Sequence, residues 1–428
     1  TGKTSVIGAL VKTLETLSYK TVLLAPTGRA AKVFGVYAGH AAFTVHKVIY
    51  RQKAFSADYE GFQVAPNLYK NTLFIADEAS MISTVSGDSA ISGSGNLLSD
   101  LVEYVYSGER CRLILCGDTA QLPPVGQVES RAMREDELSA YSLSVSSFEL
   151  KQVARQKEDS GILYNATRLR CDMGVQPLPL PQIRTKDYPD IEHVSGMDMI
   201  ETLASAYDRD GMDQTIVITR SNKRANLFNQ GIRNRIFYRE EELSAGDLLL
   251  VAKNNYFWSE QYKEIDFIAN GDIARVVRVV RTTSMYGFRF ADVFLFFPDY
   301  DIEIDAKVLL DTLTTDTPAL STEQNQNLFW SVYEDYADLH TKQQKMRAMK
   351  KNPYFNALQV KYGYAVTCHK AQGGQWQNVF VDMAVLNPDG VGVDFYRWFY
   401  TAMTRATGHL YLINLGNDFR TEGEKSEW

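Results

Sequence analysis

The chain has 428 residues, of which 45% are hydrophobic and 23% are charged, and its formal net charge at pH 7 is −7. These values are typical of a globular protein and exclude a disordered, collagen-like or fibrous chain. At roughly 100–200 residues per domain, the length predicts about three domains. Because the global field of an acidic chain repels nucleic acid, any contact with nucleic acid requires a local basic patch.

The sequence has no apolar run approaching the ~18 residues that a membrane span needs, and no secretory leader pattern. None of the four cysteines belongs to a CxxC pair, so we expect neither a zinc site nor a disulfide framework. We therefore expect a cytoplasmic protein without a membrane partner. The chain does not begin with Met, and we expect it to be a fragment of a longer product.

The first half alternates predicted helices and short apolar strands. A helix is expected over 3–18, and strands are expected over 20–26, 72–76 and 112–116. This alternation favours a parallel sheet covered on both faces. Polar residues follow each strand, which is where open α/β sheets bind ligands.

The same alternation returns later in the chain. Strands are predicted over 215–219, 378–382 and 410–414, which indicates a second α/β domain. The region from about Gly246 to Gly363 interrupts this domain. Its first half contains strands joined by short turns, among them Tyr286-Gly287, and indicates a small barrel. Its second half, about 320–360, is predicted to be helical.

The first four residues, Thr1-Gly2-Lys3-Thr4, match the last four positions of the P-loop motif G-x-x-x-x-G-K-[ST]. In that motif, backbone N–H groups and the lysine bind phosphates, and the threonine hydroxyl binds Mg²⁺. A GKT sequence at a helix start also arises by chance, so both interpretations stay open here.

Asp77-Glu78 directly follow the apolar strand 72–76. In phosphoryl transfer, such a pair holds Mg²⁺ and polarises the attacking water. An acidic helix cap is the alternative, and the GKT segment upstream favours the nucleotide site. Gln121 in GDTAQLPP can hydrogen-bond a γ-phosphate, and Arg155 and Arg405 can stabilise charge that builds on it. A polar turn stopped by two prolines is the alternative for Gln121. Taken without the other motifs, each arginine is better explained as an exposed residue in a salt bridge.

Taken in order along the chain, eight segments are similar to the superfamily 1 helicases: TGKT, APTGRAAK, TVH, ADEAS, GDTAQLPPVG, VARQ, TCHKAQG and TAMTRA. The chain most resembles the 5′→3′ branch, which contains the RecD-like and Dda-like enzymes, P-loop NTPases with UvrD-type C-terminal motifs. Each segment is short, but eight in the right order are specific, and they extend from residue 1 to about residue 414.

The resemblance implies ATP and Mg²⁺ as cofactors and assigns residues to three kinds of site. The implied catalytic residues are Lys3, Glu78, Gln121, Arg155 and Arg405. The implied nucleotide-binding residues are Thr1, Gly2, Lys3, Thr4, Asp77, Gln121, Gln372 and Gly373, with Thr4 and Asp77 on the metal. The implied DNA-binding residues are Pro26, Thr27, His46, Asn270, Thr367 and His369.

The resemblance also implies an α/β fold of two RecA-like parallel-sheet P-loop domains. The first is expected at 1–165, N-terminally truncated, with a pin-like β-hairpin insertion at 48–70. The second is expected at 166–245 and 361–428, and an SH3-like β-barrel with a helical extension occupies 246–360. Three aromatic side chains of the pin are candidates for separating the strands of a duplex: Phe55, Tyr59 and Phe62.

The function implied is an ATP-dependent DNA helicase or translocase, moving 5′→3′ on single-stranded DNA and unwinding duplex in repair or recombination. Its expected partners are single-stranded DNA, single-strand/duplex junctions and a single-strand-binding or recombination protein, and we expect a monomer. Three alternatives stay open: a helicase subunit of an exonuclease V-like complex, an RNA-directed superfamily 1 helicase, and a non-motor nucleic-acid-binding module with an inactive P-loop. Because the upstream half of Walker A is missing, we expect impaired ATP binding by this chain.

Overall fold

The computed structural model describes residues 3–52, 62–85, 93–150, 160–263, 265, 267–384 and 390–421. The chain forms two compact units. The first contains Thr1–His193, Gln372–Gln377 and Met383–Trp428, and the second contains Val194–Ala371 and Asn378–Asp382.

A four-stranded parallel sheet with the order β2-β1-β5-β6 forms the centre of the first unit. Its strands are β1 (Lys20–Ala25), β2 (Ala42–Thr44), β5 (Thr72–Ala76) and β6 (Arg112–Leu115). The helices around it are α1 (Lys3–Thr16), α2 (Gly28–Ala38), α3 (Val45–Ile49) and α4 (Leu97–Ser107). The predicted parallel α/β arrangement of this region is confirmed.

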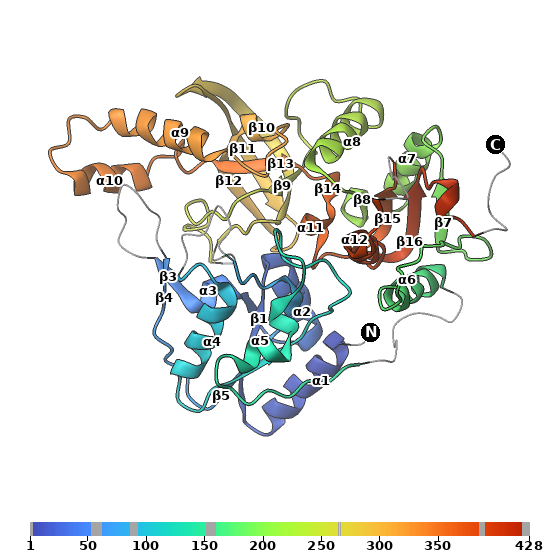
Figure 1. Ribbon diagram of the computed structural model, residues 1–428. Coiled ribbons are helices and arrows are strands. Elements are labelled where there is room, and N and C mark those ends of the chain that lie inside the picture. The colour runs from blue at the N-terminus through green and yellow to red at the C-terminus, as the bar shows by residue number, and fades with distance from the viewer. Residues whose placement is uncertain are drawn as a thin grey trace. The chain divides into compact units, whose positions relative to one another are not determined.

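Helices cover both faces of this sheet, since consecutive strand residues point to opposite sides. Leu23 and Ile75 pack against α1 and α2, whereas Leu24 and Phe74 pack against α3 and α4. Figure 1 shows these two pairs of helices on opposite sides of β1. The runs of apolar residues that predicted the strands therefore reflect burial on both faces.

The remaining elements of the first unit include a short antiparallel pair, β3 (Tyr50–Gln52) and β4 (Phe62–Val64), inside the predicted insertion at 48–70. Phe55 and Tyr59 lie outside the described residues, as does the side chain of Phe62. Further along the chain are α5 (Glu135–Ser139), α6 (Gly161–Asp172), β7 (Ile191–Val194), α12 (Val393–Met403) and β16 (Ala406–Ile413).

A closed five-stranded barrel with the order β10-β11-β12-β13-β9 forms the core of the second unit. Its strands are β9 (Leu248–Val251), β10 (Ile273–Met285), β11 (Phe288–Phe297), β12 (Ile302–Leu309) and β13 (Leu358–Tyr362). The predicted Tyr286-Gly287 turn joins β10 to β11. Both turn residues have positive φ, 55° and 78°, as two-residue hairpins require. The prediction of a small barrel is confirmed.

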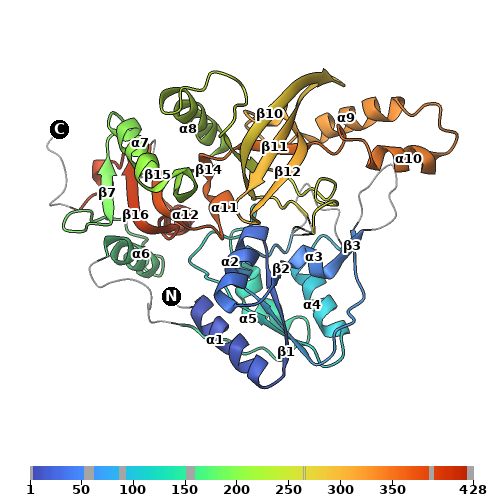
Figure 2. The same cartoon turned by 180° about the vertical axis from the view of Figure 1, so that it is seen from behind.

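The region predicted as one helical stretch over about 320–360 is instead two helices, α9 (Thr322–Glu334) and α10 (Lys342–Lys350), followed by β13. Thr341 starts the second helix, because its side chain and that of Gln344 form a capping box. Figures 1 and 2 both show α9 and α10 side by side next to the barrel. Their apolar faces pack on Phe290 and Leu309 of the barrel.

The second unit also contains part of a parallel sheet. β8 (Thr215–Thr219) pairs with β14 (Ala365–Thr367) and with residues 378–381 of β15 (Trp376–Asp382). Three helices accompany these strands: α7 (Met199–Asp210), α8 (Asn222–Arg235) and α11 (Cys368–Ala371). In the described part of the chain, no helix has the length and hydrophobicity that a membrane span requires.

Candidate functional site

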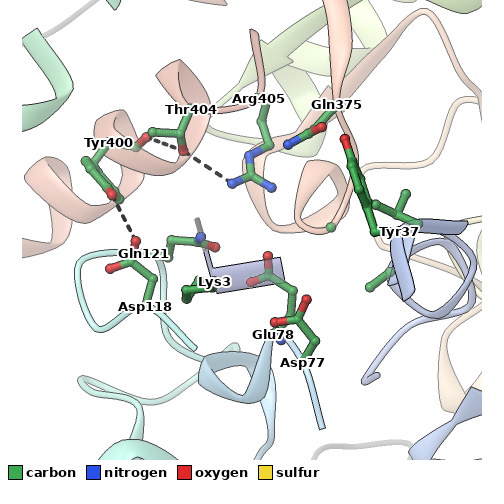
Figure 3. A pocket seen from close by; sticks show the side chains of 13 residues that line it. Lys3, Tyr37, Asp77, Glu78, Asp118, Gln121, Gln375, Tyr400, Thr404 and Arg405 are labelled. Atoms are coloured by element: carbon green, nitrogen blue, oxygen red, sulfur yellow. Dashed lines mark hydrogen bonds between the residues drawn. The ribbon is translucent and has the colours of Figure 1, made fainter. Parts of the chain in front are cut away.

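A pocket in the first unit collects most of the residues predicted to act on nucleotide (Figure 3). It is lined by Lys3, Ala30, Val33, Tyr37, Asp77, Glu78, Asp118, Gln121, Gly373, Gln375, Tyr400, Thr404 and Arg405. The structure thus brings together six of the predicted catalytic or nucleotide-binding residues from segments far apart in the sequence.

The fold explains why these side chains meet. Lys3 is the first residue of α1, Asp77 directly follows β5, and Asp118 lies shortly after β6. The strands are parallel, so their carboxyl ends lie at one edge of the sheet, where ligands of α/β proteins bind. Arg405 reaches the same pocket from the turn between α12 and β16.

Three buried polar atoms of the pocket have no hydrogen-bond partner among the described residues. They are Lys3 Nζ, Glu78 Oε2 and Gln121 Oε1. A buried polar atom without a partner costs about 1–3 kcal/mol, and more when it is charged. An ammonium group, a carboxylate and an amide oxygen left unsatisfied in one pocket are suited to bind a polar, charged ligand.

Arg405 supplies a second unpaired cation. Its side chain is buried, with 4% exposure, and its donors reach only neutral oxygens. Nε donates to the Thr401 carbonyl at 3.0 Å, Nη1 to the Gly374 carbonyl at 3.4 Å and Nη2 to Thr404 Oγ1 at 3.2 Å. Among the described residues, Arg405 forms no ion pair with a carboxylate. A buried guanidinium without a counter-charge fits an anionic ligand.

The carboxylates after β5 are held in place by backbone contacts. The backbone N–H of Asp77 donates to the Leu24 carbonyl at 2.9 Å, and Asp77 Oδ1 accepts from the Glu78 N–H at 2.9 Å. Glu78 has left-handed φ and ψ of 51° and 35°. This conformation is uncommon for a residue with a side chain, costs of order 1–3 kcal/mol and occurs often at functional sites.

Asp118 belongs to a network that ties the β6 loop to α12. Its Oδ2 accepts from the Tyr400 hydroxyl at 2.9 Å (Figure 3). Its Oδ1 lies 3.4 Å from Arg170 Nη1. Burial, and then the charge of Asp118, raise the pKa of Tyr400, so its hydroxyl stays protonated. Four residues after Asp118, the Leu122 N–H donates to Thr401 Oγ1 at 2.8 Å. The loop that carries Gln121 is therefore fixed at both ends.

Gly373 approaches α2 closely. Its φ is +76°, and a Cβ there would lie 2.9 Å from the Ala30 Cβ and 3.4 Å from Thr27 Oγ1. Gln372 does not line the pocket, because its amide donates to the Leu122 carbonyl at 2.8 Å. Gln375 lines it instead.

Sequence reasoning missed the pocket residues Tyr37, Gln375, Tyr400 and Thr404. Tyr400 lies in α12 and Thr404 follows its last residue, both within five residues of Arg405. Their closeness in sequence to a predicted site arginine is a signal that could have identified them.

The predicted DNA-binding residues are distributed over both units. In the first unit, Thr27 accepts from the Ala30 N–H and caps α2, and burial lowers the pKa of His46. Pro26 lies just after β1 in the same unit. In the second unit, burial also lowers the pKa of His369, one residue after the start of α11.

Thr367 and Asn270 also belong to the second unit. Thr367 ends β14, and Asn270 accepts a hydrogen bond from Lys370. No described contact of the six DNA-binding candidates identifies a nucleic-acid ligand.

Some predicted residues lie outside the described part of the chain. They are Thr1, Gly2, Arg155 and the side chain of Thr4. Among the described residues, no group of three or more His, Cys, Asp or Glu side chains could hold a metal ion. Burial and Asp77 raise the pKa of Cys116 to about 12, so its thiol stays neutral beside the pocket.

Two family models match the chain: an AAA domain over residues 1–174 and a UvrD-like helicase C-terminal domain over residues 362–413. The ATP-dependent RecD2 DNA helicase of Deinococcus radiodurans is 36% identical over 126 residues, which are 29% of this chain. The chain covers only 15% of that relative's length.

Solved structures of Pif1 helicases are similar over nearly the whole chain. A Bacteroides Pif1 helicase in complex with ADP-AlF3 and ssDNA is 14% identical, with a TM-score of 0.50, over 98% of this chain and 88% of that one. Pif1 helicase from Candida albicans is 15% identical, with a TM-score of 0.47, over 98% of this chain and 90% of that one.

At such identities the structural likeness concerns the fold alone. The fold, the two family models, the RecD2 relative and the ordered motifs agree. The two family models and the RecD2 relative therefore support the resemblance to the superfamily 1 helicases.

Proposed function

We propose that the protein is an ATP-dependent DNA helicase or translocase that moves 5′→3′ on single-stranded DNA. The observation that carries this proposal is the pocket that Lys3, Glu78, Gln121 and Arg405 line together. Among the described residues, Lys3 Nζ has no hydrogen-bond partner there and the Arg405 guanidinium bonds only to neutral oxygens. The relatives named above, an ATP-dependent DNA helicase and a Pif1 helicase in complex with ADP-AlF3 and ssDNA, support ATP and single-stranded DNA as ligands.

Four pocket residues then have roles in ATP hydrolysis. Lys3 binds the β- and γ-phosphates, and Glu78 accepts a proton from the attacking water. Gln121 either accepts a hydrogen bond from that water through Oε1 or senses the γ-phosphate by donating its side-chain amide N–H. Arg405 stabilises the negative charge that develops on the transferred phosphoryl group, and Arg155 is its proposed counterpart.

The site fits a magnesium ion only in company with the nucleotide. Mg²⁺ typically keeps several waters and takes one or two carboxylates plus substrate phosphates. Asp77, 6% exposed at the pocket, and the Thr4 hydroxyl are the residues that we propose to hold it. When bound, the ion neutralises charge on the β- and γ-phosphates.

For the second ligand, we propose that Pro26, Thr27, His46, Asn270, Thr367 and His369 contact the DNA backbone. Contacts to phosphate and sugar do not depend on base sequence, which suits a translocase. We further propose RecA-like domains at 1–165 and at 166–245 with 361–428, a pin-like insertion at 48–70, and an SH3-like barrel with its helical extension at 246–360.

ATP turnover with and without oligo(dT) tests the proposed chemistry. We expect stimulation by the oligonucleotide, and loss of turnover in Lys3→Ala and Glu78→Gln. Glu78→Gln removes the base but leaves the phosphate ligands, so it should still bind ATP, whereas Lys3→Ala should bind it weakly. Full turnover in both variants would contradict the assignment of the pocket.

A further inference from the structure

The barrel hairpin of the second unit carries three arginines at a regular spacing. Arg275, Arg278 and Arg281 lie on β10, each three residues after the one before. In a regular strand, side chains alternate between the two faces. Arg278 would then point away from the face shared by the other two arginines.

Two irregularities in β10 correct this alternation. Opposite the three arginines lie Phe296, Phe294 and Asp292 of β11, in that order. The register shifts once between Val276 and Arg278 and again between Val279 and Arg281. Each β-bulge adds one residue on β10 and re-aims the side chains that follow it.

The contacts confirm that all three arginines share one face. The Arg275 guanidinium lies 5.4 Å from the centre of the Phe296 ring, and that of Arg278 lies 4.7 Å from the centre of the Phe294 ring. Arg281 Nε donates to Asp292 Oδ2 at 2.6 Å. Their partners on β11 are half-buried and alternate with buried residues such as Val293 and Leu295. We call these three residues the arginine column.

The column is accessible along the free edge of β10. Among the described residues, β9 pairs only with residues 273–275 of β10, so the strand has no neighbour on that side from Val277 to Met285. Arg278 is exposed, and the Arg281 side chain is 70% exposed. Figures 1 and 2 show the β10–β11 hairpin from both sides.

The chemistry of the column suits phosphates. Within the described part of the chain, Arg275 and Arg278 form no ion pair, and each is held on an aromatic ring. A guanidinium fixed in this way presents a planar fork of N–H donors at little entropic cost. Asp292 also binds Lys307, so the pair of Arg281 with Asp292 leaves a net positive group there.

The neighbouring strand adds an opposite charge. Glu303 and Asp305 of β12 pair with Phe296 and Phe294 of β11. Strand β11 therefore lies between these two carboxylates and the arginine column. These exposed carboxylates repel a polyanion from β12 and confine it to the free edge of β10. Successive arginines are two β11 residues apart, roughly 6.8 Å, a spacing that consecutive phosphates of an extended strand can match.

We propose that the arginine column binds the phosphate backbone of single-stranded DNA, as a contact additional to the motif residues. This inference rests on the proposed function, since it supplies a second surface for the same ligand. The chain has a net charge of −7, so binding of a polyanion requires a local group of cations. The arginine column is such a group.

The test is the salt dependence of binding of a fluorescein-labelled dT20 to the full chain. Each phosphate contact to a single strand contributes about 0.7 to the slope of log K against log salt. Replacing Arg275, Arg278 and Arg281 by Gln should lower that slope by about 2, and affinity at ~0.1 M salt should fall about 100-fold. Replacing all three by Lys should keep most of the slope, because the charges remain.

A control variant removes the same charge elsewhere in the second unit. Lys342 and Arg347 of α10 and Lys351, the residue after it, changed to Gln should leave the slope nearly as in the wild type. Basal ATP turnover should be unchanged in every variant, since the column lies outside the nucleotide pocket.

Three results would overturn the proposal. One is an unchanged slope in the Arg→Gln variant while the wild type binds dT20 with steep salt dependence. Another is an equal loss in the α10 variant. The third is binding of a poly-Glu peptide that depends on the column while dT20 binding does not, which would make the surface a docking site for acidic peptide. Failure of the proposed function is distinct, because the wild-type chain itself would then not bind dT20.

Discussion

Arg405 is a pocket residue that is both charged and buried. Its guanidinium is 4% exposed, bonded only to neutral oxygens, and lies in a pocket with the unsatisfied Lys3 Nζ. Such an arrangement is costly without an anion and favourable with one. We propose that the γ-phosphate of ATP supplies that anion during turnover.

Changing Arg405 to Ala should lower kcat about 1000-fold, because arginines that contact the transferred phosphoryl group contribute at least this much. Arg405→Lys keeps the charge but not the planar fork, and should recover only part of the loss. Steady-state ATP turnover with saturating oligo(dT) measures both. A kcat within threefold of wild type in Arg405→Ala would remove the arginine from the mechanism.

Tyr400 acts as a positioning residue for Asp118 and the loop that carries Gln121. Tyr400→Phe removes the hydrogen bond to Asp118 Oδ2 and leaves the carboxylate with Arg170 and the Ala120 N–H. We expect kcat to fall about tenfold, equivalent to about 1.4 kcal/mol in the transition state, with little change in KM for ATP. Tyr396→Phe is the matched control. It lies one turn earlier on α12, and its hydroxyl donates to the Pro179 carbonyl. Equal effects of the two variants would show that the role is purely structural.

At the scale of elements, β13 places a lysine in the barrel wall without a carboxylate as hydrogen-bond partner. Lys361 is 7% exposed, and its Nζ donates to the Thr312 carbonyl at 3.2 Å, the Thr315 carbonyl at 2.6 Å and Thr315 Oγ1 at 3.1 Å. Burial, followed by the charge of Lys370, lowers the pKa of Lys361 to about 8, while Asp316 opposes this shift. Burying a charged lysine here therefore costs stability.

The sign of the pH dependence follows from that shift. Below pH 8 the lysine is protonated in both the folded and the unfolded chain, and the cost of burial is complete. Between pH 8 and about 10.5 the folded chain releases the proton first, so the free energy of unfolding rises by at most about 1.4 kcal/mol per pH unit.

Urea unfolding at pH 8 and 9.5 measures this increase in the free energy of unfolding. The Lys361→Met variant should show a smaller increase. Burial also lowers the pKa of Lys370 to about 8. Lys370 therefore accounts for any dependence of the free energy of unfolding on pH that remains in the Lys361→Met variant. The same pH dependence in the Lys361→Met variant and in the wild type would show that Lys361 keeps its charge in the folded chain.

At the scale of the whole molecule, the sequence predicted those helices and strands that depend mainly on residues close together in the chain. Apolar runs such as 72–76 and 215–219 coincide with β5 and β8 because strands buried on both faces need continuous apolar residues. The predicted site residues Lys3, Asp77, Glu78, Gln121, Gly373 and Arg405 meet in one pocket, because their motifs end or begin regular elements of the fold. Their roles in catalysis stay predictions.

Features that depend on register and packing were not predictable. The contact of Tyr400 with Asp118 joins residues 282 positions apart, and no local pattern indicates it. The arginine column depends on two β-bulges, whereas strict alternation would separate Arg278 from the other two arginines. The break between α9 and α10 depends on the Thr341 cap inside a stretch that is otherwise helical in pattern.

We propose a motor that hydrolyses ATP while it moves 5′→3′ along single-stranded DNA. Unwinding of matched duplexes with a 5′ or a 3′ single-stranded tail, with ATP and Mg²⁺ on the full-length protein, tests it most directly. We predict that only the 5′-tailed duplex opens and that Glu78→Gln opens neither. Opening of only the 3′-tailed duplex would contradict the polarity, and opening of neither by the wild-type protein would contradict the helicase activity.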